Sequence, residues 1–156
     1  MNTVKFHEHI IRISEPGVSR NALWEGLLEY VRHPEDYVEH MVGSRMLSEE
    51  MSDVGPVLKR EIDFGNFKLT DRVIIRENES ILTLVDAGPN WKSSSLLIRI
   101  EEPEAGAVFL RFVYEEEKSD EEVPAMFVQL RRQAYEAKDQ QLVEGVLNAL
   151  VAKASR

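Results

Sequence analysis

The chain has 156 residues, of which 43% are hydrophobic and 30% charged, and its 19 Lys and Arg against 28 Asp and Glu give a formal net charge of −9. This length and composition predict a single domain over residues 1–156 with a buried core, and the negative charge disfavours binding to nucleic acid or to anionic membrane surfaces. The lack of cysteine excludes disulfides, thiol catalysis and thiolate metal sites.

The N-terminal part of the sequence predicts one strand and one helix. Residues 4–13 alternate in hydrophobicity, as expected of a strand. Residues 23–31 repeat apolar side chains at three- and four-residue spacing, which is typical of an amphipathic helix, and Ser19 is a suitable N-cap. Pro34 should end this helix, and a short second turn is expected over residues 34–40.

The middle of the chain, residues 45–114, follows a period of two and therefore predicts β-strands. Turn signals divide it into about six consecutive strands joined by hairpins. The turns fall at residues 53–56, 65–66, 77–79, 87–90 and 102–106. These strands should form an antiparallel meander rather than a parallel crossover fold.

Beyond an acidic stretch at residues 115–122, apolar side chains recur at helical spacing to the end of the chain, which predicts one long C-terminal helix. A sheet with one apolar face has to be covered, and this helix is the only predicted element large enough to cover it. The predicted fold is α+β, with a curved antiparallel sheet of about seven strands wrapped around the long helix. One or two short helices should follow the first strand.

Six short segments of the sequence, taken together with this order of elements, resemble a known protein family. They are His9-Ile10-Ile11, Leu23-Trp24-Glu25-Gly26-Leu27, Arg32-His33-Pro34, Phe64-Gly65-Asn66, Glu101-Glu102-Pro103-Glu104 and Phe109-Leu110-Arg111-Phe112-Val113-Tyr114. Together they resemble the AtaL-like family of START-related (SRPBCC) proteins. This resemblance implies the helix-grip fold of the Bet v 1-like superfamily. It also implies a cavity between helix and sheet that holds an apolar or aromatic small molecule, and it carries over no catalytic residue.

Features that the sequence lacks lead to predictions of the protein's location and of its cofactors. No apolar run is long enough to span a bilayer, and charged side chains occupy the first sixteen residues, where a signal peptide would need an apolar segment. We therefore expect a cytoplasmic protein without membrane insertion. The glycines are scattered and form no phosphate loop or dinucleotide fingerprint, so no cofactor is expected. A homodimer is compatible with the sequence but is not indicated by it.

Two histidines lie two residues apart on the predicted first strand. His7 and His9 should project from one face together with Ile11. This spacing can place two imidazoles on one metal ion, but the motif lacks a third ligand, and we predict no metal site. His9 is instead expected as a polar group at the cavity wall, or alternatively as a histidine at the edge of the core bonded to a backbone carbonyl.

The last predicted strand has one uncharged face. Leu110, Phe112 and Tyr114 share it, so Tyr114 should point inward. A buried tyrosine hydroxyl needs a hydrogen-bond partner, which is either a neighbouring polar group or a ligand. The carboxylates at residues 115–122 are assigned to a turn before the last helix rather than to a cation site, because they complement the helix dipole.

The dipeptide Gly65-Asn66, taken as a two-residue turn, fixes the register of the strands on either side of it. Arg60 then lies opposite Asp71, on a face that otherwise carries apolar pairs. Two opposite charges would enter the interior together, where a charge-assisted hydrogen bond satisfies both. We predict a buried Arg60–Asp71 pair that fixes the hairpin register, with a polar anchor for a ligand as the alternative.

The candidate ligand-binding residues are those expected on the inner faces of strands and helices. They are His9, Ile11, Trp24, Leu28, Phe67, Asp71, Leu110, Phe112, Tyr114, Phe127 and Leu130. Trp24, Phe127 and Leu130 are expected to line the space between the helices and the sheet.

Two hypotheses follow for the function. The leading one is the binding of a hydrophobic or aromatic small molecule in the cavity, oriented by His9, Asp71 and Tyr114. The alternative is a small enzyme of the cyclase, dehydratase or isomerase type, in which these same polar residues perform acid/base catalysis in a closed pocket.

Overall fold

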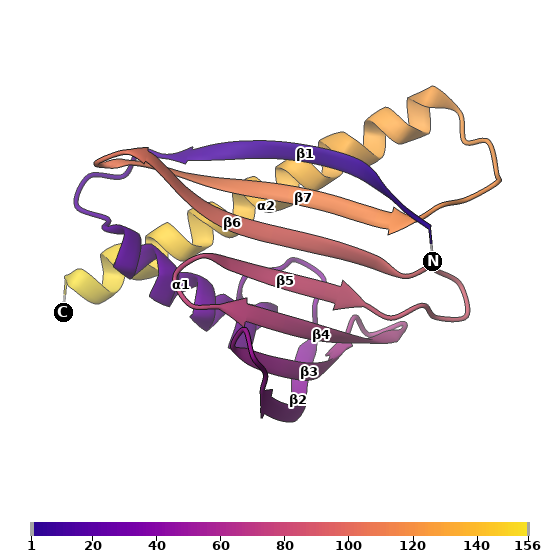
Figure 1. Cartoon of the computed structure of the whole chain (residues 1–156), viewed down its shortest axis with the longest axis horizontal. Helices are drawn as coiled ribbons and strands as arrows, with labels where there is room; N and C mark the ends of the chain where they lie inside the picture. Colours follow the sequence, from indigo (N-terminus) through magenta and orange to yellow (C-terminus); the bar gives the residue numbers. More distant parts are fainter. Residues whose placement is uncertain (1, 156) are drawn as a thin grey trace.

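One curved antiparallel sheet holds a long helix against its inner face (Figure 1). The structure is a computed structural model and describes residues 2–155. Its strands are β1 (Thr3–Ile13), β2 (Gly43–Met51), β3 (Pro56–Asp63), β4 (Lys68–Arg76), β5 (Ser80–Val85), β6 (Ser94–Glu104) and β7 (Ala107–Glu117). The seven strands lie in the order β1-β7-β6-β5-β4-β3-β2, and every neighbouring pair is antiparallel. The predicted meander and fold class are confirmed.

Two α-helices and one short 3-10 turn complete the fold. They are α1 (Arg20–Arg32), η1 (Pro34–Asp36) and α2 (Ala125–Ala154). Ser19 is the N-cap of α1, as predicted, because its side-chain oxygen accepts the N–H of Ala22 at 3.1 Å. None of the helices in residues 2–155 is both long and apolar enough to cross a membrane.

The core lies where α1 and the C-terminal half of α2 meet the sheet. Trp24 of α1 is 1% exposed, and Leu110 and Phe112 of β7 are fully buried. Gly26 of α1 faces Val146 of α2 so closely that a Cβ at position 26 would lie 2.7 Å from Val146 Cγ1. Glycine at this position therefore allows the two helices to pack against each other.

The acidic stretch is partly strand, which corrects the assignment of residues 115–122 to a turn. Glu115, Glu116 and Glu117 continue β7 and pair with the start of β1. The ladder hydrogen bonds satisfy their backbone groups whatever the side-chain charge, and Arg131 of α2 donates to Glu116 at 2.6 Å. The first turn of α2 contains no acidic residue, and Pro124 is its N-cap.

A β-bulge alters the inner face of β1. The pairing with β7 shifts between Lys5 and His7, so the strict alternation expected for residues 4–13 is broken at Phe6. Phe6 packs edge-on against Tyr135 of α2, with ring centroids 5.8 Å apart. Strict alternation would put Phe6 on the face opposite the histidines, whereas the extra residue of the bulge turns it toward the helix.

The first turns of α2 extend past the end of the sheet (Figure 1). Phe127 is 57% exposed and Leu130 is 52% exposed, so the expectation that they face the sheet is wrong, whereas Trp24 is buried as expected. The reason is length. A helix of 30 residues spans about 45 Å, whereas an 11-residue strand spans about 36 Å. The overhanging turns therefore have no sheet to cover.

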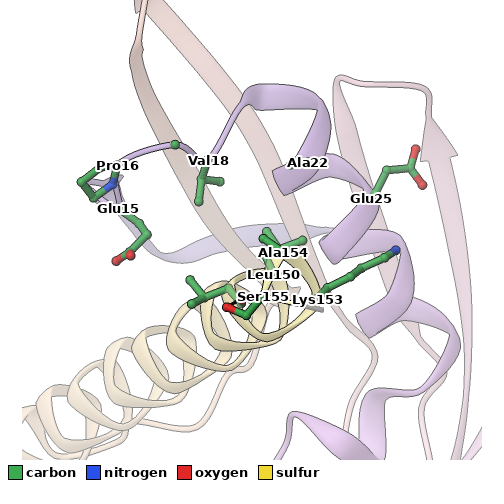
Figure 2. A pocket seen from close by; sticks show the side chains of 11 residues that line it. Glu15, Pro16, Val18, Ala22, Glu25, Leu150, Lys153, Ala154 and Ser155 are labelled. Atoms are coloured by element: carbon green, nitrogen blue, oxygen red, sulfur yellow. Dashed lines mark hydrogen bonds between the residues drawn. The ribbon is translucent and has the colours of Figure 1, made fainter.

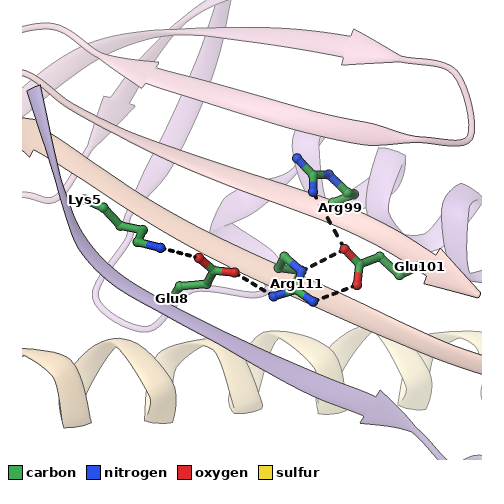
Figure 3. Close-up of polar contacts among 5 residues, drawn as sticks. All are labelled: Lys5, Glu8, Arg99, Glu101 and Arg111. Atoms are coloured by element: carbon green, nitrogen blue, oxygen red, sulfur yellow. Dashed lines mark hydrogen bonds and ion pairs between the residues drawn. The ribbon is translucent and has the colours of Figure 1, made fainter. Parts of the chain in front are cut away.

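The outer face of the sheet carries an ion network across β1, β7 and β6 (Figure 3). Arg111 Nε and Nη2 donate to both carboxylate oxygens of Glu101, at 2.7 and 3.0 Å, and Nη1 donates to Glu8 at 2.6 Å. Lys5 Nζ donates to Glu8 at 2.8 Å, and Arg99 lies 3.7 Å from Glu101. Hydrogen bonds from Lys5 and then Arg111 lower the pKa of Glu8, and those from Arg111 lower the pKa of Glu101.

Replacing Arg111 with Gln should make stability less sensitive to acid. A carboxyl whose pKa is lowered on folding contributes stability that is complete above its unfolded pKa and is lost as the pH falls through the folded value. The ordinary pKa of these carboxyls is 4.5. We expect the free energies of unfolding of wild type and Arg111→Gln, measured with urea, to differ most above that pH and to converge below it.

Arg72→Gln is the control, because no carboxylate among residues 2–155 pairs with this exposed arginine. A constant gap between wild type and Arg111→Gln would contradict the prediction.

Candidate ligand-binding site

A cavity of about 620 Å³ lies between α2 and the strands β3 to β6. Its lining residues are Tyr30, Pro34, Tyr37, Val38, Glu39, His40, Met41, Arg60, Ile62, Phe64, Leu69, Asp71, Thr83, Val85, Leu96, Ala134, Ala137, Lys138 and Gln141. Alternation along the strands directs apolar side chains inward to form much of the wall. The volume is within the range of about 300–1,000 Å³ that is usual for small-molecule sites.

A second hollow, also of about 620 Å³, lies at the C-terminal end of α2 (Figure 2). It is formed by the loop before α1, by α1 itself and by the last turns of α2. Its lining residues are Glu15, Pro16, Gly17, Val18, Ala22, Glu25, Leu150, Val151, Lys153, Ala154 and Ser155. None of these residues belongs to a strand. This hollow therefore lies outside the space between helix and sheet.

The predicted ion pair is present in the wall of the cavity. Arg60 and Asp71 are directly opposite each other in the β3–β4 ladder, and their side chains are 7% and 4% exposed. Arg60 Nε donates to Asp71 Oδ1 at 2.9 Å and Nη2 donates to Oδ2 at 2.7 Å. Nη1 donates to the carbonyl oxygen of Val31 in the last turn of α1, where a cation complements the helix dipole. The predicted register is confirmed, and Arg60 also joins this hairpin to α1.

His9 and Tyr114, which were expected to orient a ligand, contact a carboxylate of α2. The Tyr114 hydroxyl lies 2.7 Å from both carboxylate oxygens of Asp139, and His9 Nε2 lies 2.7 Å from Oδ2. Asp139 is completely buried. Burial, together with the Asp139 charge, raises the pKa of Tyr114, so the phenol keeps its proton and donates it. None of these three residues lines the cavity, and together they fasten β1 and β7 to α2.

His7 makes a similar contact one turn earlier on α2. Its Nε2 lies 2.8 Å from Oε2 of Glu136, whose side chain is 52% exposed. The His7 and His9 rings stack with centroids 5.4 Å apart. Both histidines face a carboxylate of the helix rather than the backbone carbonyl considered above. Within residues 2–155, no group of three or more His, Asp or Glu side chains is arranged to hold a metal ion.

Several polar groups of the cavity have no hydrogen-bond partner within residues 2–155, and they include the Lys138 ammonium and the Tyr30 hydroxyl. Lys138 Nζ lies 5.2 Å from the ring centroid of Tyr114 and 5.4 Å from that of Tyr135. Desolvation lowers the pKa of Lys138, and burial raises the pKa of Tyr30 to about 12. These two groups therefore remain available to a bound molecule.

The predicted site residues separate into four groups in the structure. Asp71 lines the cavity; His9 and Tyr114 contact Asp139; Ile11, Trp24, Leu28, Leu110 and Phe112 belong to the core or pack against it; and Phe67, Phe127 and Leu130 are exposed. A hydrophobic period shows which face of an element is covered, but it does not show whether another element or open space covers that face.

Three polar residues of this region, Asp139, Lys138 and Tyr30, do not occur in the predicted set. A signal exists for Asp139, which lies at helical spacing within the apolar stripe formed by Tyr135, Leu142 and other residues of α2. A charge in such a stripe needs a buried partner. Lys138 and Tyr30 carry no comparable signal, because their exposure to the cavity depends on how distant segments pack.

A seven-stranded antiparallel sheet that grips a long C-terminal helix, with a cavity between them, defines the helix-grip class of Bet v 1-like and START-like proteins. The chain belongs to the AtaL family. The model of this family, described as acetylaranotin biosynthesis cluster protein L, matches residues 9–152. No curated protein sequence matches the chain.

Solved structures share the fold at low sequence identity. The crystal structure of Ara h 8.0201 has a TM-score of 0.66 and 11% identity, over 97% of this chain and 99% of that one. A START superfamily protein from Mycobacterium smegmatis has a TM-score of 0.65 and 16% identity, over 94% and 98%. The di-domain ARO/CYC StfQ from the steffimycin biosynthetic pathway has a TM-score of 0.69 and 10% identity, over 99% of this chain and 53% of that one. These similarities establish the architecture.

Removing the Asp139 carboxylate should destabilise the protein strongly. Asp139→Ala leaves the buried hydroxyl of Tyr114 and the partly buried imidazole of His9 without their carboxylate partner, and we expect a loss of about 3–5 kcal/mol in the free energy of unfolding. Glu136→Ala is the matched control, because it removes the exposed histidine contact one turn earlier and should cost less than about 1 kcal/mol. Urea unfolding followed by circular dichroism measures both. Similar losses in the two variants would show that the buried cluster contributes no more than a surface pair.

The Arg60–Asp71 pair should behave as a unit. Asp71→Leu leaves a guanidinium buried without a counter-charge and should destabilise by about 3–5 kcal/mol. The double variant Arg60→Met/Asp71→Leu removes both charges and should lose much less stability than the single variant. Equilibrium unfolding of the two variants and of Arg60→Met tests this order. If the losses of the two single variants simply added in the double variant, the pair would not be coupled.

Proposed function

We propose that this protein binds a hydrophobic or aromatic small molecule in the cavity between α2 and the sheet. The observation that carries the proposal is the cavity itself, about 620 Å³ in volume, whose wall combines apolar side chains of β3 to β6 with polar groups of the strands, of α2 and of the segment from α1 to β2. This combination is typical of ligand sites, in which apolar area supplies affinity and a few polar atoms fix orientation. The cysteine-free sequence supports a cytoplasmic location for this binding.

The names of related proteins support a small molecule as the ligand. The family description refers to a biosynthesis cluster, and the name of StfQ refers to a biosynthetic pathway. Both names place proteins of similar sequence or fold in the production of small organic molecules. Because one fold hosts many functions, this support concerns the class of ligand rather than its identity.

A small enzyme of the cyclase, dehydratase or isomerase type is the second candidate. The observation that favours it is the pair of unpartnered proton carriers in the cavity, Lys138 and Tyr30. They replace His9 and Tyr114 as candidate acid/base groups, because the polar atoms of those two residues contact Asp139 outside the cavity. The test that separates the two candidates uses a molecule that co-purifies with the protein and is identified by native mass spectrometry. When this molecule is incubated with the protein, a binder should leave it unchanged and an enzyme should convert it.

A neutral aromatic probe should bind in this cavity, and a substitution that fills the cavity with a larger side chain should weaken that binding. We expect N-phenylnaphthylamine to increase in fluorescence on titration with the protein. Ala137→Trp places an indole on the helical wall of the cavity and should weaken this binding by about tenfold or more, because a ring of that size occupies much of the apolar space.

Ala149→Trp is the control for the neutral probe. Ala149 is an exposed residue of the same helix and does not line the cavity, so this variant should bind the probe as wild type does. Circular dichroism verifies that both variants are folded. Equal probe affinity in Ala137→Trp and wild type would show that the probe binds elsewhere and would count against the proposed site.

A further inference from the structure

The charges of the cavity wall are not all compensated. The Arg60 guanidinium is neutralised by Asp71, and all three of its nitrogens donate to protein oxygens. Glu39 lies at the rim, where its side chain is 68% exposed and beside His40. Lys138 makes no such ion pair, since no carboxylate within residues 2–155 lies within 4.0 Å of its Nζ; the Asp139 charge acts on it from a greater distance, and its oxygens accept from Tyr114 and contact His9. One ammonium group of the cavity is therefore left without an anionic partner.

Aromatic rings stabilise this ammonium without satisfying its donors. Tyr114 and Tyr135 stack with centroids 4.2 Å apart and planes 8° from parallel, and Lys138 Nζ lies near both rings. Cation–π attraction holds the charge at the wall. An ammonium has three N–H donors, however, and a π-face is a poor replacement for the oxygen acceptors that it loses with its water.

A second donor lines the same cavity. The Tyr30 hydroxyl has no acceptor within residues 2–155, and burial keeps the phenol protonated by raising its pKa to about 12. Tyr30 packs edge-on against Tyr37, with ring centroids 6.0 Å apart, so its ring is held in place. The cavity thus presents an ammonium and a phenol, both of which donate hydrogen bonds, on an otherwise largely apolar wall.

We propose that the ligand of this cavity carries an acidic oxygen, a carboxylate or a phenolate, which accepts hydrogen bonds from Lys138 Nζ and the Tyr30 hydroxyl. This inference rests on the proposed function and narrows its ligand class to apolar or aromatic acids. An anionic oxygen supplies the direct, hydrogen-bonded counter-charge that no carboxylate within residues 2–155 provides. Charge-assisted hydrogen bonds in a partly desolvated site are stronger than neutral ones. Lys138 therefore selects for acids over neutral molecules of the same shape.

A pair of probes with one skeleton tests this selection. Anilinonaphthalene sulfonate has the rings of N-phenylnaphthylamine and adds one anionic group. Wild type should bind the anionic probe about tenfold more tightly than the neutral one. Lys138→Met keeps a side chain of similar length and should abolish that preference, because the affinity for the anionic probe falls to that for the neutral one. A circular dichroism spectrum like that of wild type verifies that the variant is folded.

Lys59→Met is the matched control for net charge. Lys59 precedes Arg60 on β3 and is exposed, so its removal changes the total charge by the same amount without altering the cavity. It should retain the preference for the anionic probe.

The outcomes distinguish this inference from the proposed function. If the neutral probe binds in the cavity but wild type and Lys138→Met discriminate equally between the two probes, the selection by Lys138 is wrong and the binding function stands. An equal loss of preference in Lys59→Met would attribute the effect to long-range charge and would also overturn the inference. If neither probe binds wild type, the proposed function is wrong, and the acid selectivity is overturned with it.

Discussion

The position of α2 depends on one completely buried carboxylate, that of Asp139. A charge in that environment has to be hydrogen-bonded, and its two donors, Tyr114 and His9, come from the neighbouring strands β7 and β1. The helix is thereby held at a set distance from the sheet by polar contacts. Toward the C-terminus of α2, beyond this point, apolar side chains close into a core with α1; beside it, the cavity stays open. The carboxylate thus marks the boundary between packed interior and ligand space.

The buried charges of this protein fall into two kinds. Arg60, Asp71 and Asp139 each have hydrogen-bonded protein partners of complementary charge or polarity, so they hold elements together. Lys138 also lies between α2 and the sheet, but its ammonium has the aromatic rings of Tyr114 and Tyr135 as neighbours in place of a hydrogen-bond acceptor. Desolvation penalises both kinds alike. What separates structural from ligand-directed polar groups here is whether the protein itself completes their hydrogen bonds.

The success of the sequence-based predictions depended on how local each feature is. The β3–β4 register and the Arg60–Asp71 pair followed from the turn at Gly65-Asn66, because a two-residue turn determines every pairing in its hairpin. The order of strands followed from similar short turns. The contact between His9 and Asp139 could not be derived in this way, because the two residues are 130 positions apart. The prediction for Phe127 failed because the apolar period of a helix shows which side is covered but not how far the sheet beneath it extends. Phe127 lies on the turns beyond the sheet and is exposed.

The three-way contact of Arg60 also limits the routes by which this chain can diverge. A lineage that loses either member of the ion pair first passes through an intermediate with an unpaired interior charge, and the loss of Arg60 also removes the donor to the Val31 carbonyl at the end of α1. Positions 60 and 71 should therefore be exchanged together or not at all. Cavity residues such as Ala134, Ala137 and Thr83 belong to no ion pair and can be substituted one at a time. Descendants of one ancestor can therefore diversify their ligands quickly while the hairpin that supports the site stays nearly constant.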